Sequence, residues 1–201
     1  MNVQELKQLR PDLAFIADWV KPQSHVLDVG CGDGVMLDYL QSAKQCSGYG
    51  IEIADDKVLA CSQRGVNVIQ QDMEQGLHLF GDQSFDTVLC LSSLQMMKNV
   101  EDLLRDIARV GRESIVSFPN FGYWPHRTAL LRGKMPVSKS LPYEWYDTPN
   151  VRCATIYDFA DLAEDVGLMV TECVALHEGK QISFLPNLRG SLAVFRLCKR
   201  T

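Results

Sequence analysis

VLDVGCGDG, residues 26–34, joins an apolar run to three glycines at alternate positions. The run ends at Val29, and apolar residues then recur at helical spacing from Val35 to Leu40. This pattern predicts a buried strand, a tight glycine turn and the start of a helix. Because glycine has no Cβ, such a turn brings bare backbone N–H groups close to a ligand.

The spacing of these glycines excludes one class of ligand. In the G-x-G-x-x-G fingerprint of dinucleotide-binding enzymes, the third glycine would fall on Val35. We therefore reject a dinucleotide-dependent oxidoreductase. Here an acid, Asp28, precedes the glycines. A carboxylate beside the turn suits a positive group, such as the ammonium of an amino acid, better than a pyrophosphate. The alternative is a strand-end carboxylate that caps the loop.

Two further acids follow short β-like runs. Glu52 stands at the end of one run, and Asp72 comes three residues after the run 66–69. A carboxylate at the tip of a second strand accepts two hydrogen bonds from a ribose diol, and charge-assisted bonds of this kind contribute roughly 1.5–3 kcal/mol each. Asp72 can accept from an adenine amino group while the N–H of Met73 meets a ring nitrogen; its alternative is a helix N-cap ahead of Glu74. Ammonium, ribose and adenine contacts together describe S-adenosylmethionine.

At this point the chain resembles the class I S-adenosylmethionine-dependent methyltransferases. The glycine loop, Glu52, QDM (71–73) and SFDTVL (84–89) match successive motifs of that family in order. The resemblance implies that residues 91–95 line the methionine end of the pocket, with simple loop packing as the alternative. It also implies S-adenosylmethionine or S-adenosylhomocysteine as the ligand. The predicted cofactor-binding residues are Asp28, Gly30, Cys31, Gly32, Gly34, Glu52, Ile53, Asp72, Met73, Leu91, Ser92 and Gln95.

A closer resemblance covers nearly the whole chain. The motifs LDVGCGDG (27–34), QQDMEQGL (70–77), FPNFG (118–122), LPYEWYDTPN (141–150) and TIYDF (155–159) are similar to those of the methionine-biosynthesis protein MetW family. That family acts together with a homoserine O-acyltransferase and has no settled methyl acceptor. The resemblance implies an S-adenosylmethionine-binding accessory or regulatory protein of methionine biosynthesis. The alternative is an active methyltransferase on an unidentified small molecule.

Strand and helix patterns alternate along residues 1–201, which predicts one α/β domain. We expect a three-layer, Rossmann-like sandwich with a seven-stranded, mostly parallel sheet, and the family resemblance implies that the last strand is antiparallel. The expected strands are residues 24–29, 47–52, 65–69, 85–90, 113–118, 168–177 and 191–198. The expected helices are residues 11–20, 34–43, 55–63, 74–80, 98–111 and 156–167.

An aromatic-rich insertion, residues 119–155, interrupts this alternation and contains Phe, Tyr and Trp at six positions. Loops of this length in a compact domain are usually functional or disordered, and six aromatic side chains that can bury much surface argue against disorder. We expect a helix over residues 125–132 and a lid or partner surface. His126 is a candidate base, although a structural histidine is the stronger interpretation. No residue is identified as catalytic.

Charge and cysteine content exclude other functions. The net charge is −5 and no basic patch is evident, so we expect no nucleic-acid partner. No run reaches 18 apolar residues, so we expect no membrane span. Seven scattered cysteines without a C-x-x-C pair predict reduced thiols, no metal site and a cytoplasmic location. Cys31 is either a reactive nucleophile or, more simply, a small residue that fits the turn.

Overall fold

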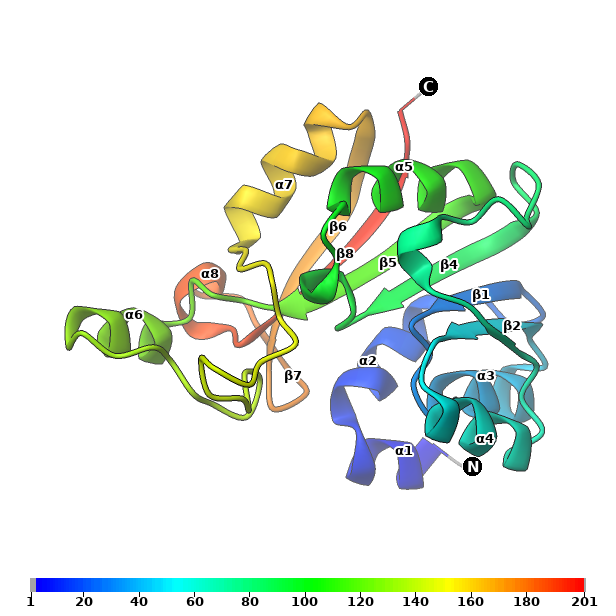
Figure 1. The fold of residues 1–201 in the computed structure, drawn as a ribbon, viewed down its shortest axis with the longest axis horizontal. Coiled ribbons are helices and arrows are strands. Elements are labelled where there is room, and N and C mark those ends of the chain that lie inside the picture. The colour runs from blue at the N-terminus through cyan, green and yellow to red at the C-terminus, as the bar shows by residue number, and fades with distance from the viewer. Residues whose placement is uncertain (1–2, 201) are drawn as a thin grey trace.

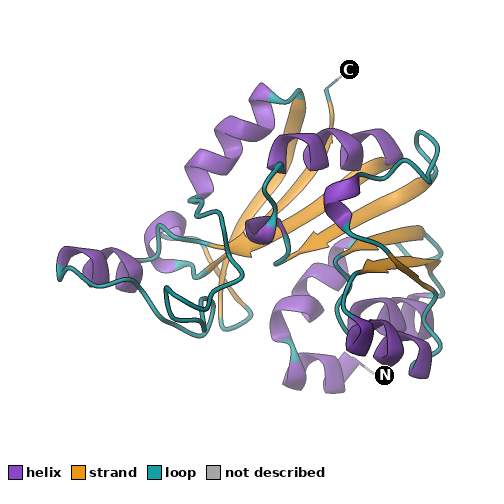
Figure 2. Ribbon diagram, viewed as in Figure 1, coloured by secondary structure: helices purple, strands orange, loops and turns teal. Residues whose placement is uncertain are grey.

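The computed structural model describes residues 3–200 as a twisted sheet with helices on both faces (Figures 1 and 2). Within these residues the sheet has eight strands in the order β3-β2-β1-β4-β5-β8-β6-β7. The strands are β1 (His25–Val29), β2 (Ser47–Glu52), β3 (Val68–Gln70), β4 (Phe85–Leu91), β5 (Gly111–Pro119), β6 (Leu168–His177), β7 (Lys180–Ile182) and β8 (Leu192–Lys199).

The first five strands pair in parallel, and β8 runs antiparallel to both β5 and β6. This arrangement confirms the predicted class I methyltransferase fold. The described sheet has one strand more than predicted, because β7 folds back on β6 through the pairs Ala175–Ile182 and His177–Lys180. The extra strand lies at the sheet edge and leaves the central order unchanged.

Two helical layers cover the sheet. In Figure 1, α5 and α7 lie on one face, and α1 to α4 lie on the other. Each layer buries its own apolar cluster against the strands. In α5, for example, the buried positions Leu103, Leu104, Ile107 and Val110 form one stripe at helical spacing. The helices are α1 (Val3–Leu9), α2 (Pro11–Trp19), α3 (Val35–Lys44), α4 (Asp55–Gln63), α5 (Val100–Val110), α6 (Trp124–Leu131), α7 (Ile156–Asp165) and α8 (Pro186–Arg189), with 3-10 turns η1 (Met73–Gln75) and η2 (Leu94–Met96).

Three local expectations need correction. The helix expected over residues 74–80 is the single 3-10 turn η1, which ends where Gly76 takes a φ of +78°. Between the strands expected at residues 168–177 and 191–198, where no element was predicted, the structure contains β7 and α8. Helix α1 precedes the first predicted helix. These elements are short and depend on tertiary contacts rather than on a strong apolar period.

The aromatic-rich insertion contains the predicted helix as α6, which extends away from the sheet in Figure 1. Its base is closed by a bridge between Asn120 and Ala154. We expected its aromatic side chains to be buried, and for several this is wrong: Trp145 is 70% exposed and Tyr146 is 71% exposed. Across residues 3–200, none of the helices has the length and apolarity needed to cross a bilayer.

Candidate functional site

The predicted cofactor residues gather at one edge of the sheet. Strand β1 lies between β2 and β4, so the chain after each of these strands emerges at their shared carboxyl edge. This is the point where the strand order reverses, and it is where open α/β sheets bind ligands. Asp28 lies in β1, Glu52 ends β2 and Leu91 ends β4. The fold therefore brings together three sequence segments that were identified separately.

The glycine loop after β1 is held against β2 by backbone hydrogen bonds. The N–H groups of Gly30 and Cys31 donate to the carbonyl of Ile51, at 2.9 and 3.0 Å. Gly30, Gly32 and Gly34 have φ values of +77°, +57° and +76°, a region that side chains with a Cβ rarely adopt. A Cβ on Gly30 would also lie 2.4 Å from the Oγ of Ser93. The loop thus needs glycine for both conformation and space.

Glu52 joins the loop to the start of the β2–α4 connection. Its Oε2 accepts from the N–H of Gly32 at 2.9 Å, and its Oε1 accepts from the N–H groups of Ile53 and Ala54 at 2.8 and 3.1 Å. The carboxylate is therefore fixed beside the loop. The neighbouring Ile53 exposes 55% of its surface, so an apolar side chain stands next to the acid at the sheet edge.

Asp28 is a buried carboxylate without a complete set of partners. Its Oδ1 is inaccessible to solvent and finds no hydrogen bond among the described residues. Burial, with a smaller contribution from the negative charge of Glu52, raises the pKa of Asp28 to about 7. An unpaired buried acceptor is costly. A cationic ligand at this position would remove that cost.

Asp72 and Met73 lie after β3. The Oδ1 of Asp72 accepts from the N–H of Glu74 at 2.9 Å, so the carboxylate does cap η1. The cap uses one of its two oxygens. The side chain of Met73 packs beside the glycine loop, because its Cε would lie 2.9 Å from a Cβ on Gly30.

The chain after β4 supports the glycine loop from the other side. Ser92 adopts a left-handed conformation with a φ of +54° and donates its N–H to Ser117. Such strain is frequent near binding sites. The side chain of Gln95 donates to the carbonyl of Ser92 at 2.6 Å. Ser93 lies in the stretch 91–95 that is predicted to line the pocket, and its Oγ donates to the carbonyl of Gly30 at 3.3 Å. No sequence signal distinguishes Ser93 from its neighbour.

Cys31 packs as a small buried residue. Its Sγ lies 3.8 Å from the Sγ of Cys61, and a Cβ on Gly50 would lie 2.4 Å from it. Burial, followed by the negative charge of Asp28, raises the pKa of the Cys31 thiol. Because thiolate is the nucleophilic form, this environment favours the structural interpretation of Cys31.

His126 and Asn120 hold the base of the aromatic-rich insertion. The Nδ1 and Nε2 of His126 lie 3.2 Å from the carbonyl of Asn120 and 2.9 Å from the Oγ of Ser138. Burial lowers the pKa of His126. The amide of Asn120 donates to the carbonyls of Asn187 and Gly190 at 2.9 and 2.8 Å. Both ring nitrogens of His126 are engaged, so the structural interpretation of this histidine is the better one.

Comparison with solved structures agrees with the observed topology. A methyltransferase from Thermotoga maritima, described as a possible histamine N-methyltransferase, aligns with a TM-score of 0.69 at 18% identity, covering 98% of this chain and 94% of that one. A TehB-like S-adenosylmethionine-dependent methyltransferase from Corynebacterium glutamicum aligns with a TM-score of 0.66 at 16% identity, covering 98% and 94%. At these identities the likeness concerns the fold.

Sequence comparison is more specific. The "Bifunctional methionine biosynthesis protein MetXA/MetW" of Rhodopirellula baltica is 34% identical over an alignment 200 residues long. The alignment covers 92% of this chain. The chain spans about a third of that relative's length, with 32% of it covered. The family model described as "Methionine biosynthesis protein MetW" matches residues 10–197. This protein is therefore a methyltransferase-like chain associated with methionine biosynthesis, and it belongs to the MetW family.

Proposed function

We propose that this chain binds S-adenosylmethionine or S-adenosylhomocysteine and acts as an accessory, regulatory partner of a homoserine O-acyltransferase. The observation that carries the cofactor assignment is the unpartnered, buried Oδ1 of Asp28 beside the glycine loop. A ligand ammonium at this position would complete the hydrogen bonding of Asp28 and offset the cost of its buried charge.

The nucleoside part of the ligand would lie along the same edge of the sheet. Glu52 would accept from the ribose hydroxyls, exchanging or sharing bonds that its oxygens now receive from backbone N–H groups. Ile53 would give the adenine an apolar contact, and the Oδ2 of Asp72 would accept from its amino group. Leu91, Ser92 and Gln95 would border the methionine end.

The accessory role rests on the aromatic-rich insertion and on one relative. Trp145 and Tyr146 are 70% and 71% exposed, and their rings pack edge to face at 5.7 Å. Tyrosine and tryptophan are enriched among residues that dominate binding energy in interfaces. The name of the Rhodopirellula relative joins MetXA and MetW functions in one chain. A tethered pair of modules meets at high effective concentration, which is consistent with two proteins that work together.

Regulation by S-adenosylmethionine follows from the pathway. It is a downstream product of methionine, so a ligand that favours one conformation of this chain can alter its affinity for the acyltransferase. Residues Val151 and Arg152 of the insertion donate their N–H groups to the carbonyl of Gln95, at 2.9 and 3.0 Å. A change at the methionine end therefore has a direct contact through which to reach the insertion.

Calorimetric titration with S-adenosylmethionine tests the cofactor assignment. Glu52→Ala should weaken binding about tenfold or more, because one or two charge-assisted bonds are lost. Glu52→Gln keeps an acceptor oxygen and separates this loss from damage to the loop. Glu164→Ala, an exposed acid on α7, is the control. Unchanged affinity in both Glu52 variants would remove this residue from the site.

Acyl transfer to homoserine by the partner enzyme, measured with and without this chain, tests the accessory role. Trp145→Ala and Tyr146→Ala should lower the stimulated rate while S-adenosylmethionine binding persists. Tyr157→Ala is the matched control, because Tyr157 is 65% exposed but lies on α7 outside the insertion. Equal rates with and without the protein, at every S-adenosylmethionine concentration, would defeat the accessory role and favour a methyltransferase acting on a small molecule.

A further inference from the structure

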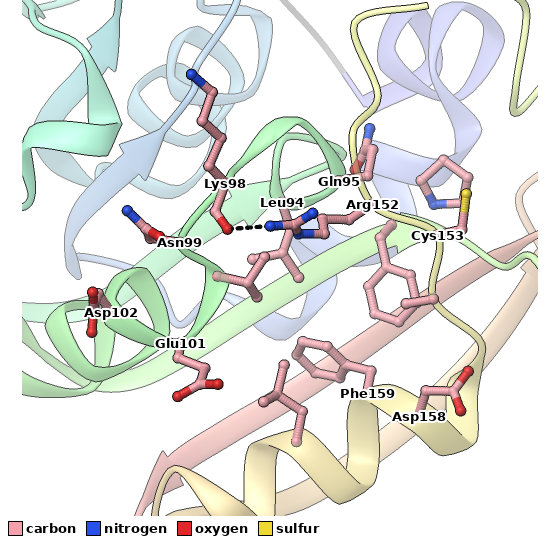
Figure 3. Close-up of a pocket in the computed structure, with 15 residues that line it drawn as sticks. Leu94, Gln95, Lys98, Asn99, Glu101, Asp102, Arg152, Cys153, Asp158 and Phe159 are labelled. Atoms are coloured by element: carbon pink, nitrogen blue, oxygen red, sulfur yellow. Dashed lines mark hydrogen bonds between the residues drawn. The ribbon is translucent and has the colours of Figure 1, made fainter. Parts of the chain in front are cut away.

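A cavity of about 540 Å³ lies between the start of α5 and the start of α7, below the chain segment that contains Arg152 (Figure 3). It has one lining residue, Gln95, in common with the predicted cofactor set. Its volume falls in the range of small-molecule sites in proteins. The cavity therefore offers room for a ligand other than the nucleoside part of the cofactor.

The floor of the cavity is apolar. Leu94, Phe118 and Phe159 line it and are buried in the protein core. The rings of Phe118 and Phe159 pack with centroids 4.9 Å apart. Leu162 of α7 continues the same surface. Such a floor favours the burial of a hydrocarbon or aromatic group.

Arg152 places a fixed positive charge above this floor. Its Nη2 donates to the carbonyl of Lys98 at 2.6 Å, as the dashed line in Figure 3 shows, and its Nη1 donates to the carbonyl of Val151 at 3.4 Å. Carbonyl acceptors hold the guanidinium in position but do not neutralise it. Among residues 3–200, no carboxylate forms an ion pair with Arg152. A guanidinium has five N–H donors, so donors remain for a ligand.

The acids around the cavity are already engaged. Glu101 and Asp102 pair with Arg105 at 3.0 and 3.1 Å. Asp158 accepts from the N–H and the Oγ1 of Thr155 in the capping box of α7. Among the described acids that line the cavity, none therefore forms an ion pair with the guanidinium of Arg152. Lys98 also lines the cavity, but in Figure 3 its side chain extends away from the apolar floor.

We propose that this cavity binds a small carboxylic acid with an apolar body. The carboxylate would pair with the guanidinium of Arg152, for which planar, two-point recognition of carboxylates is typical. The apolar body would lie on Phe118, Phe159 and Leu162. This inference goes beyond the proposed function and stands on the cavity alone, because it requires neither S-adenosylmethionine nor an acyltransferase.

The first test is a binding comparison by ligand-observed NMR on the full chain without added cofactor. The probes are 3-phenylpropanoate and 3-phenylpropanamide, which share an apolar body and differ in charge. The acid should bind about tenfold more tightly than the amide, because a charge-assisted contact at a solvent-exposed arginine is worth about one factor of ten. Arg152→Gln should remove this difference, and Arg132→Gln, an exposed cation on the insertion, should preserve it. Equal binding of the two probes, or an unchanged preference in Arg152→Gln, would overturn the proposal.

A second test locates the ligand without any substitution. Cys153 is among the residues that line the cavity, whereas Cys173, which is also exposed, lies on β6. Burial raises the pKa of both thiols, so alkylation by iodoacetamide is followed at about pH 8.5, where thiolate forms more readily. Saturating 3-phenylpropanoate should slow alkylation of Cys153 several-fold and leave Cys173 unchanged. Equal rates at Cys153 with and without the acid would place the ligand elsewhere and refute the assignment.

Discussion

The substitution Asp28→Asn tests whether ionisation of the buried Asp28 carboxyl lowers the free energy of unfolding. The pKa of Asp28 is raised from 3.8 to about 7, first by burial and then by the negative charge of Glu52. Between these two values the folded protein holds a proton that the unfolded chain has released. The folded state therefore binds more protons than the unfolded state, and stability must fall as pH rises across this window.

The magnitude follows from the width of the window. One pKa unit corresponds to about 1.4 kcal/mol. Because Asp28 of the folded protein is already half ionised at pH 7, the stability lost between pH 5 and pH 7 from Asp28 alone is about 2 kcal/mol. The asparagine variant has no proton to lose there. Its free energy of unfolding should therefore decline less than that of the original protein over the same pH range, by an amount of this order.

Urea unfolding at pH 5, 6, 7 and 8 measures the difference directly. All other titrating groups, including His126, are common to both proteins and cancel in the comparison. Asp56→Asn, at an exposed position on α4, is the control and should follow the original protein. Asp28→Asn should also weaken S-adenosylmethionine binding, since the ammonium loses its charged partner. Parallel stability curves for Asp28→Asn and the original protein would refute the electrostatic account of this site.

Two further substitutions test the loop and the insertion. Gly30→Ala should destabilise the protein by about 2 kcal/mol or more in urea unfolding, because its Cβ would lie 2.4 Å from the Oγ of Ser93. Gly65 has a similar φ of +74°, but a Cβ there meets no described atom within 4 Å, so Gly65→Ala should cost only about 1 kcal/mol. Equal losses in the two variants would contradict the steric argument. His126→Ala should speed proteolysis within residues 123–150 and leave the sheet intact, because both ring contacts are lost. Burial lowers the pKa of His126, so protonation of this histidine destabilises the folded insertion. Proteolysis of the original protein should therefore accelerate as pH falls below about 6.5. A proteolysis rate that is independent of pH would argue against this role of His126.

The amino-acid sequence was sufficient to predict the central sheet and to place the predicted site residues at the ends of neighbouring strands. A glycine turn after an apolar run, and acids at the ends of successive strands, are local patterns. Because parallel strands end at the same edge, the sequence positions of Asp28 and Glu52 already imply that they meet. The conformation of the glycine loop could also be predicted, because it depends on residue type.

Other features depend on contacts between residues far apart in the chain, and only the tertiary structure decided them. The support that Ser93 gives to Gly30, and the anchoring of Asn120 by α8, join segments that no local pattern connects. The exposure of Trp145 was predicted wrongly, because aromatic content indicates the capacity for burial and not its partner. Asp28 was identified from its position, but its unpaired oxygen depends on every group around it. The cavity beneath Arg152 likewise forms only when the insertion returns across the loop after β4, because its wall and its floor belong to different segments.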